Sequence, residues 1–442
     1  MSVLAIKGGT PVRTRMFPAY RIFGEEEKTA ACRVIDSNVL SKFLGTWHPD
    51  FYGGPEVRGF EGAWKELYGV KHAVALNSAT SGLYACVGAA GIGPGDEVIV
   101  SPYTMSASCV AALVYGAIPV FADIEPDYFC LDPKSIEARI TPRTRAIIVV
   151  DIFGQPYDVE AINRIAEKHG LVVIEDCAQA PLATWRGRYA GTFGTMGVYS
   201  LNYHKHVHTG EGGVVVTEDD DLAERVRLIR NHAEAVVEAK GVTDIVNMIG
   251  FNYRMTELEA AIGQEQVKKV RGLIDARRRN ADLLAAGIGQ IDGITPPATR
   301  ADCTNSYYFM AFKYDKTKLK DVPRDTFIKA VKAELPDTEL REGEGAQIGM
   351  GYVKPLYLQP LYQQKIAFGR NGWPFSAAPE LPSYERGICP VVEKLHFEEL
   401  FTTELMRPPM TSEDLQAVID AFHKVYAHLD ELRPSGAAVA VL

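Results

Sequence analysis

The segment Leu171-Val-Val-Ile-Glu-Asp-Cys-Ala-Gln-Ala180 joins an apolar run to two adjacent carboxylates. The run is apolar at odd and even positions alike, which is typical of a strand buried on both faces of a sheet. A helical pattern precedes it at Val159 to His169, with Asp158 as N-cap and Gly170 behind its end. Similar apolar runs are Ala73 to Leu76, Val98 to Val100, Pro119 to Phe121 and Ala146 to Val150. This alternation predicts an α/β fold with a mainly parallel central sheet.

The 442 residues are enough for two domains. After about residue 216 the sequence changes to long charged helical stretches at 219–231 and 256–285, followed by weaker strand signals and a last helix that starts near Ser412. A separate helical pattern, Glu25 to Ile35, lies near the N-terminus. We therefore expect an N-terminal arm and helix over residues 1–40, a large domain over 41–280 and a smaller α+β domain over 281–442.

Composition and charge argue against several classes of protein. The formal net charge is -9, from 47 basic and 56 acidic residues, and there is no basic stripe, so we expect no nucleic-acid partner. No apolar run reaches the roughly 18 residues of a membrane span. The first 15 residues also lack the apolar core of a signal peptide. We expect a cytoplasmic protein without a membrane partner.

Polar side chains follow predicted strands at their carboxyl ends, where ligands bind in an open α/β sheet. Asn77-Ser-Ala-Thr-Ser-Gly82 opens a helix with small and hydroxyl side chains, and the free N–H groups of a helix start can bind a phosphate. Asp176 ends another strand and could keep a pyridine nitrogen protonated. Each feature also has a purely structural interpretation, as a capped helix start and as a carboxylate that caps a turn.

A third segment is Ser200-Leu-Asn-Tyr-His-Lys-His-Val-His-Thr-Gly-Glu-Gly-Gly213. Lys205 lies between an apolar strand and a glycine-rich turn, a position that suits a desolvated amine with a lowered pKa that forms an imine. Ser200 could reach the phosphate of the same cofactor.

The same segment allows a metal-site hypothesis. If the stretch were extended, three alternating histidines would share one face, as metal ligands do: His204, His206 and His208. No carboxylate or cysteine nearby completes such a set, so we expect no metal.

Together these motifs resemble the DegT/DnrJ/EryC1/StrS family of sugar aminotransferases, which depend on pyridoxal 5′-phosphate (PLP). The resemblance runs from about Ile22 to Ala427, with the three segments in the right order and spacing. Further matching motifs are Gly54-Pro-Glu-Val-Arg-Gly-Phe-Glu61, Gly91-Ile-Gly-Pro-Gly-Asp-Glu-Val-Ile-Val100 and Gly250-Phe-Asn-Tyr-Arg-Met255. The resemblance implies the fold-type-I aminotransferase architecture, in which the large domain at 41–280 binds PLP.

By position, the resemblance implies two catalytic residues, Lys205 as the Schiff-base lysine and Asp176 as the partner of the pyridine nitrogen. Gln179 would contact the ring hydroxyl. The cofactor phosphate would be held by Ala79, Thr80 and Ser200.

The family completes its active site across a dimer interface, which implies a homodimer in which Asn252 reaches the phosphate of the partner subunit. Asn252 could instead cap the helix that begins near Thr256. Where the family has an aromatic residue over the cofactor ring, this chain has Met105, whose thioether can cover a ring face, or Tyr103 could serve. Candidate substrate contacts are Tyr103, His206, Tyr307 and Tyr352.

The implied reaction moves an amino group from glutamate or glutamine to a nucleotide-linked keto-sugar or a keto-cyclitol, through pyridoxamine phosphate, as in antibiotic or polysaccharide biosynthesis. A PLP-dependent sugar deoxygenase or dehydratase of the same family is one alternative, but it would carry histidine in place of Lys205. An NAD-dependent sugar oxidoreductase is another, but Gly91-Ile-Gly-Pro-Gly95 precedes a strand instead of following one.

Overall fold

The computed structural model describes residues 3–433, so residues 1–2 and 434–442, the ends of the expected arm and small domain, lie outside the described residues. A seven-stranded sheet has the order β1-β9-β8-β5-β4-β2-β3. Neighbouring strands are parallel except at β9, which is antiparallel to both β1 and β8. The predicted α/β fold with a mainly parallel sheet is confirmed. The strands are β1 (His72–Leu76), β2 (Glu97–Val100), β3 (Ile118–Phe121), β4 (Thr144–Val150), β5 (Val172–Asp176), β8 (Met196–Ser200) and β9 (Gly213–Thr217).

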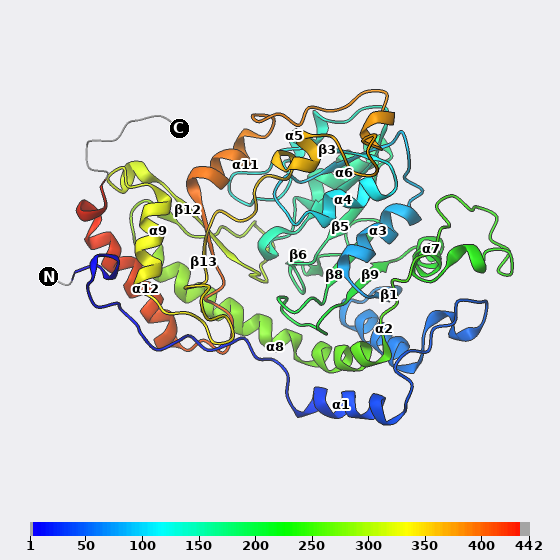
Figure 1. The fold of residues 1–442 in the computed structure, drawn as a ribbon, viewed down its shortest axis with the longest axis horizontal. Coiled ribbons are helices and arrows are strands. Elements are labelled where there is room, and N and C mark those ends of the chain that lie inside the picture. The colour runs from blue at the N-terminus through cyan, green and yellow to red at the C-terminus, as the bar shows by residue number, and fades with distance from the viewer. Residues whose placement is uncertain (1–2, 434–442) are drawn as a thin grey trace.

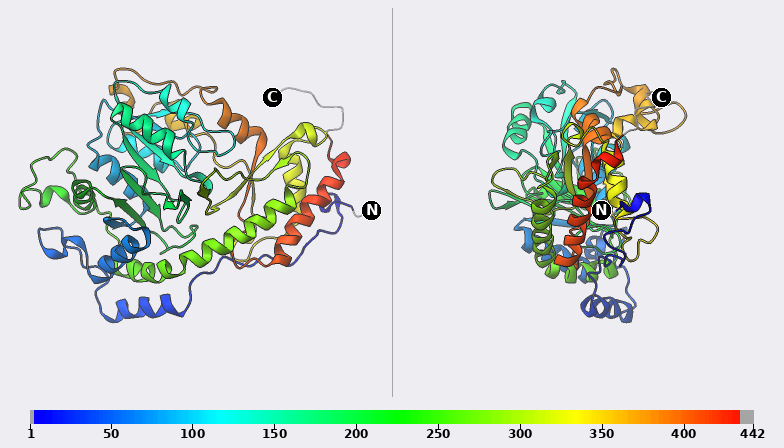
Figure 2. Two further views of the ribbon diagram at one scale, coloured as in Figure 1. Left: turned by 180° about the vertical axis from the view of Figure 1, so that it is seen from behind. Right: turned by 90° about the vertical axis from the view of Figure 1, so that its left-hand side faces the viewer.

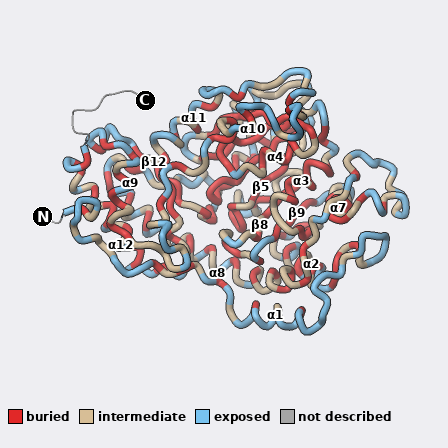
Figure 3. Tube along the Cα trace, in the orientation of Figure 1, coloured by how far each residue is buried: buried red, intermediate tan, exposed pale blue. Residues whose placement is uncertain are grey.

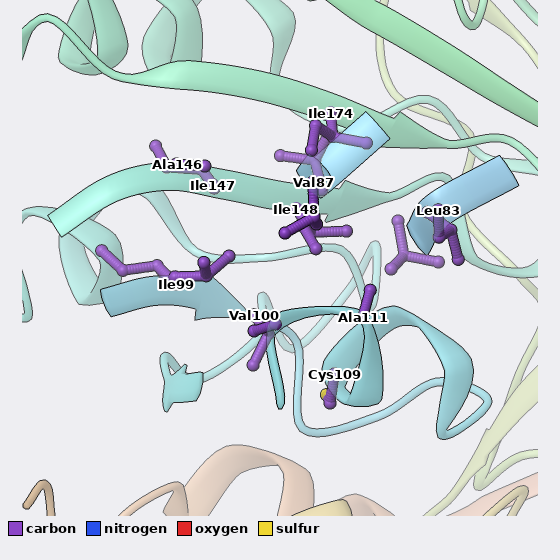
Figure 4. Packing of buried hydrophobic residues seen from close by; sticks show 14 of the residues in the cluster. Leu83, Val87, Ile99, Val100, Cys109, Ala111, Ala146, Ile147, Ile148 and Ile174 are labelled. Carbon is purple, nitrogen blue, oxygen red and sulfur yellow. The ribbon is translucent and has the colours of Figure 1, made fainter. Parts of the chain in front are cut away.

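Helices pack on both faces of this sheet (Figures 1 and 2). Along β1, Val74 and Leu76 belong to one core with α3 and α7, whereas Ala73 and Ala75 belong to another core with α2 and α8. Figure 4 shows residues of α3, among them Leu83, facing the apolar side chains of the strands. The helices around the sheet are α2 (Pro55–Tyr68), α3 (Ala79–Ala89), α4 (Ala107–Val114), α5 (Pro133–Glu137), α6 (Val159–His169), α7 (Asp220–Arg230) and α8 (Glu257–Ile288).

Helix ends follow the capping signals in the sequence. The side chain of Asp158 accepts a hydrogen bond from the N–H of Ala161 at 3.0 Å, and Gly170 closes α6 with a left-handed φ of 64°. Thr256 and Glu259 form a reciprocal capping box at the start of α8. These contacts fix where α6 and α8 begin, and the predicted helix over 159–169 is confirmed.

A smaller part of the chain has its own sheet and core. Its sheet has the order β10-β12-β14-β13, and α8 runs into it from the large part (Figure 2). Leu4 and Phe17 of the N-terminal arm pack in this small core, whereas α1 (Glu25–Asp36) packs on α8. The other elements are β10 (Ile294–Thr295), β12 (Met310–Tyr314), β13 (Ile348–Met350), β14 (Leu400–Thr403), α9 (Arg324–Ala333) and α12 (Ser412–Ala427).

The small domain is expected to begin at residue 281. One segment after that residue nevertheless packs in the core of the large part. Its buried side chains, Leu356, Tyr362 and Leu395 among them, pack with β2, β3 and α4, and it carries α10 (Pro360–Gln363) and α11 (Pro390–Lys394). A third sheet, β11-β6-β7, joins Cys303–Thr304 to Thr184–Trp185 and Arg188–Tyr189. In Figure 3 the buried positions concentrate along the central strands. Within residues 3–433, no helix has the length and apolar character needed to cross a membrane.

Candidate active site

The carboxyl ends of β1, β5 and β8 lie at one edge of the central sheet, because these three strands run in the same direction. Asn77 follows β1, Asp176 ends β5 and Ser200 ends β8. The structure therefore brings the three sequence features together at the place where open α/β sheets bind ligands.

Asp176 is a buried carboxylate held by two donors. Its Oδ2 accepts from Ser108 Oγ at 2.7 Å, and its Oδ1 accepts from the N–H of Ala178 at 3.1 Å. Burial raises the pKa of Asp176, while these hydrogen bonds and the charge of Lys205 lower it in part. A cationic partner would offset the remaining cost of burying this charge, so the site fits a protonated pyridine nitrogen.

The neighbouring Glu175 has a different role. Its Oε2 accepts from the N–H of Gly191 at 2.7 Å, and its Oε1 accepts from the N–H groups of Phe193, at 2.6 Å, and Gly194. These bonds hold the loop before β8 against β5. Both carboxylates thus hold backbone N–H groups, as the structural interpretation of the acidic pair expects, and Asp176 in addition lies close enough to Lys205 for their charges to interact.

Lys205 lies in the turn after β8, with its Nζ 4.2 Å from the ring centroid of Tyr308. Burial lowers the pKa of its amine to about 8, against a smaller raising effect of Asp176, and no hydrogen bond contributes. With this pKa roughly a tenth to a fifth of the amine is neutral near physiological pH, far more than for an ordinary lysine, and the neutral amine is the form that condenses with an aldehyde.

The N-terminus of α3 lies directly beside the end of β8. Ser200 pairs with Gly213 of β9, and a Cβ on Gly213 would lie 2.4 Å from the carbonyl carbon of Ser78 and 2.5 Å from the nitrogen of Ala79. Because Gly213 has no side chain, the helix start approaches Ser200 closely. The first N–H groups of a helix have no intrahelical acceptor, so Ala79, Thr80 and Ser200 form a cradle that fits a phosphate.

Gln179 links the strand edge to the smaller part of the chain. Its Oε1 accepts from the N–H of Phe153 at 2.8 Å, and its Nε2 donates to Tyr352 Oη at 3.0 Å. The N–H of Tyr352 donates in turn to Tyr103 Oη at 2.9 Å. These side chains form one connected network, in which Tyr103 is fully buried and has its hydroxyl occupied.

Met105 is 61% exposed, unlike the buried Tyr103. Its carbonyl accepts from the N–H of Ser108 at 3.3 Å, and Ser108 also binds Asp176. Met105 therefore lies beside the carboxylate that would bind the ring nitrogen, with its side chain free. Of the two candidates for covering the cofactor ring, Met105 has the accessible side chain.

Two of the expected substrate residues lie in protein surroundings. The hydroxyl of Tyr307 lies near Thr299, and the ring of His206 is fully buried with Nε2 at 2.9 Å from the carbonyl of Ser306. The adjacent Tyr308, which belongs to the same Asn305 to Tyr308 segment but is not among the candidate substrate contacts, has its ring under the amine of Lys205. Tyr307 has a left-handed φ of 51°.

Asn252 lies on an exposed segment beside the start of α3. Its carbonyl accepts from Asn77 Nδ2 at 3.3 Å, and its Oδ1 accepts from Arg254 Nε at 2.8 Å. The N-cap of α8 is Thr256, so the alternative capping role of Asn252 is wrong. Its expected contact with a partner subunit stays a prediction.

The three alternating histidines do not form a metal site. The segment after β8 is a turn, so His206 bonds to Ser306 while His208 packs edge-on against Phe23 at 4.5 Å between ring centroids. The extended conformation that this hypothesis needs is absent from the described segment. The group whose ligand atoms do converge is Asp151, Glu175 and Cys177, buried behind the strand edge.

A cavity of about 260 Å³ opens beside Tyr203 and His204, which precede Lys205 in the turn after β8, but Lys205 itself does not line it. Its walls come from the N-terminal arm, the lysine turn and the smaller part of the chain, and include Tyr20, His204, Arg341, Glu404 and Arg407. This volume lies just below the range of about 300–1,000 Å³ for drug-sized ligands, so the cavity suits a small polar molecule.

The comparisons with known proteins agree with this geometry. The model of the DegT/DnrJ/EryC1/StrS aminotransferase family matches residues 45–422. The L-glutamine:2-deoxy-scyllo-inosose aminotransferase of Streptomyces fradiae is 36% identical over 76% of this chain and 80% of its own. The aminotransferase structure from Psychrobacter cryohalolentis is 29% identical, with a TM-score of 0.79 over 94% of this chain and 100% of its own. The structure of DesI in the presence of its TDP-sugar product is 27% identical, with a TM-score of 0.77 over 97% of both chains.

Proposed function

Because the chain belongs to the DegT/DnrJ/EryC1/StrS family and is an aminotransferase, we propose that it moves the amino group of L-glutamine onto a keto-cyclitol, with PLP at the strand edge. The observation that carries this proposal is the convergence of Lys205, Asp176 and the start of α3 at one edge of the sheet. The Streptomyces fradiae relative, an L-glutamine:2-deoxy-scyllo-inosose aminotransferase, supports the choice of both substrates.

The residues at this edge match the parts of PLP one by one. Asp176 would hold the ring nitrogen, Gln179 the ring hydroxyl, and Thr80 with Ser200 the phosphate. PLP, when bound, supplies an aldehyde that condenses with amines and a ring that accepts electrons when a proton leaves the adjacent carbon. Asp176 would keep the ring nitrogen protonated, because its charge is buried and its two oxygens accept from neutral donors within residues 3–433.

Lys205 has two tasks in this proposal. Its amine, with a pKa of about 8, would hold PLP through the aldehyde carbon when no substrate is bound. When free, the same amine would serve as the base that takes the proton from the substrate carbon that bears nitrogen. The ring of Tyr308, with its centroid 4.2 Å from Nζ, would restrict where the amine can move.

The relatives favour a cyclitol over a nucleotide-linked sugar as acceptor. The proteins of Streptomyces fradiae and Streptomyces lividus, 36% and 35% identical to this chain, are both L-glutamine:2-deoxy-scyllo-inosose aminotransferases. The structure of DesI with a TDP-sugar makes a nucleotide-linked acceptor the alternative to test.

We also propose that the enzyme works as a homodimer. Large apolar side chains are exposed on two segments near Asn252, with exposed fractions of 41–67%. Exposed large apolar side chains gathered on neighbouring segments are typical of a protein interface. The residues are Val39, Leu40, Leu44, Trp47, Ile245, Val246 and Ile249. Light scattering should give a mass of two chains, and a single-chain mass would contradict this arrangement.

The proposed reaction is tested with the purified enzyme and two ketones. Borohydride reduction of the PLP-loaded protein should fix the cofactor on the peptide that contains Lys205, as detected by mass spectrometry. With L-glutamine as donor, the enzyme should aminate 2-deoxy-scyllo-inosose faster than a TDP-linked keto-hexose. A preference for the nucleotide-linked sugar would overturn the choice of acceptor, and no amination of any ketone would overturn the reaction itself.

A further inference from the structure

The backbone that follows Lys205 depends on hydrogen bonds from other parts of the chain. The turn before it is held by its own residues, since the N–H of Lys205 donates to the carbonyl of Asn202 at 2.8 Å. Residues 206–208, in contrast, form no backbone–backbone hydrogen bond within residues 3–433. Groups from outside the turn must therefore decide where this part of the segment lies.

Three separate elements supply such groups. Tyr20 Oη of the N-terminal arm donates to the carbonyl of His206 at 2.5 Å. The ring of His206 is fully buried, with Nε2 at 2.9 Å from the carbonyl of Ser306. On α8, Gln266 Oε1 accepts from the N–H of His208 at 3.4 Å. His206 is thus fixed at both its carbonyl and its ring, by two segments that lie far apart in the sequence.

Tyr20 is itself held on two sides. Three residues before it, Phe17 is fully buried in the small core. The N–H of Phe17 donates to the carbonyl of Asp337 at 3.0 Å, and its carbonyl accepts from the N–H of Glu339 at 2.9 Å. The ring of Tyr20 packs 4.9 Å from the Cζ of Arg277, a fully buried side chain of α8. Backbone pairing before the ring and packing against it therefore fix where the hydroxyl lies.

We propose that Tyr20 is a positioning residue for Lys205, an inference that rests on the proposed bond between Lys205 and PLP. The hydroxyl of Tyr20 holds the carbonyl of His206, which directly follows Lys205, and so restricts the backbone from which the lysine side chain extends. The ring of Tyr308 restricts the other end, with its centroid 4.2 Å from Nζ. An amine held at both ends loses little freedom when it bonds to the aldehyde carbon.

Tyr20 acts through the lysine and not on a substrate. Tyr20 lines the cavity, but its hydroxyl hydrogen is donated to the carbonyl of His206. A tyrosine hydroxyl has one hydrogen, so it cannot donate to a bound ligand at the same time. Loss of the hydroxyl should therefore change the placement of Lys205 and leave the contacts to the cofactor ring and phosphate, which we assign to the strand edge, as they are.

The test compares PLP with pyridoxamine phosphate as ligands of the purified protein. The two molecules share ring and phosphate, but only PLP has the aldehyde that bonds to Lys205, so the ratio of their dissociation constants reports the lysine bond. We expect Tyr20→Phe to weaken PLP relative to pyridoxamine phosphate roughly 3- to 10-fold, the usual net effect of one hydrogen bond. Tyr20→Leu, which also removes the ring, should lower the ratio at least as far. Fluorescence titration measures both affinities.

Tyr314→Phe is the matched control. Tyr314 Oη donates to the carbonyl of Val322 at 2.8 Å in the small core, so this substitution also removes one hydroxyl that holds a backbone carbonyl. It should lower the melting temperature about as much as Tyr20→Phe does, and leave the ratio of affinities at the wild-type value. An equal fall of the ratio in both variants would overturn the positioning role, because the effect would then follow from lost stability.

Lys205→Ala separates this inference from the proposed role of the lysine. It should weaken PLP and leave the affinity for pyridoxamine phosphate within about twofold of the wild type. If it does so while Tyr20→Phe keeps the wild-type ratio, the lysine bond stands and Tyr20 does not position it. If Lys205→Ala itself keeps the wild-type ratio, the proposed bond to Lys205 is wrong, and the role of Tyr20 fails with it.

Discussion

The strand edge of the large part and the cavity wall contributed by the smaller part differ in how their polar groups are satisfied. At the edge, both oxygens of Asp176 and both polar atoms of Gln179 have protein partners within 3.1 Å. In the wall, two buried nitrogens of Arg407 have no hydrogen-bond partner within residues 3–433. The polar groups of the edge are already held in place for a cofactor that is the same in every step. The polar groups of the wall would gain their partners only from a bound substrate. Changes at the edge should therefore affect every step, and changes in the wall should depend on the substrate.

The largest effect should come from Lys205→Ala at the edge. Loss of both the covalent attachment and the proton transfer should lower kcat/KM about 10⁴-fold for every donor and acceptor. Steady-state assays with two donors would measure this, and an added primary amine such as methylamine should restore part of the rate by replacing the missing base. A loss confined to one substrate would contradict the division between edge and wall.

Asp176→Ala should have the next largest effect. Without the buried charge the ring nitrogen loses its proton, so both half-reactions should slow by about 10²–10³-fold. Asp158→Ala is the matched control, because it removes a carboxylate that caps α6 and should lower stability by about 1 kcal/mol while leaving the kinetics unchanged. If only one half-reaction slowed, Asp176 would act on one substrate, as the cavity wall is expected to do, and not on the cofactor.

Lys205 also predicts a dependence of stability on pH in the protein without cofactor. Its pKa of about 8 lies below the value of 10.5 that applies when unfolded, so the folded state binds fewer protons between these pH values. Wild-type stability should therefore rise across this window relative to Lys205→Met. Urea unfolding should find the variant more stable by about 1–3 kcal/mol at pH 7, with the gap closing by pH 10.5. A constant gap would show that the amine is not desolvated at the edge.

Gly213→Ala tests the close approach of α3 to β9. The new Cβ would meet Ser78 and Ala79 at about 2.4–2.5 Å, so the helix start must move, at a cost of about 1–3 kcal/mol in the free energy of unfolding. The affinity for PLP should also fall, because the start of α3 would no longer lie where it can bind the cofactor phosphate. Gly272→Ala is the control, because a Cβ there meets nothing within 4 Å and should raise stability by up to about 1 kcal/mol. If both substitutions changed stability and PLP affinity equally, the close approach of α3 to β9 would not be what forms the phosphate cradle.

The strand edge could be predicted from the sequence, because its residues follow local signals. Asp176, Ser200 and Thr80 each lie where an apolar strand ends, and parallel strands bring such ends together. The cavity wall could not be predicted in this way. Tyr20 reaches the carbonyl of His206 across 186 residues, and Tyr308 depends on the left-handed backbone at Tyr307. These contacts depend on how the arm and the smaller part fold back onto the large part, which no local pattern records.

Substitution of Met105 should show the smallest effect on cofactor binding. Met105 lies at the strand edge, but its side chain is exposed and available to a ligand, as the polar groups of the cavity wall are. A contact between a thioether and an aromatic ring stabilises binding by about 0.3–1.5 kcal/mol, so Met105→Ala should weaken the affinity for PLP about 2- to 10-fold. Met16→Ala, at another exposed methionine, should leave cofactor affinity unchanged. Met105→Trp should bind PLP more tightly than the wild type, because a ring stacks over a larger area. Fluorescence titration with PLP would rank the variants, and equal affinity of Met105→Ala and the wild type would mean that nothing from this position covers the ring.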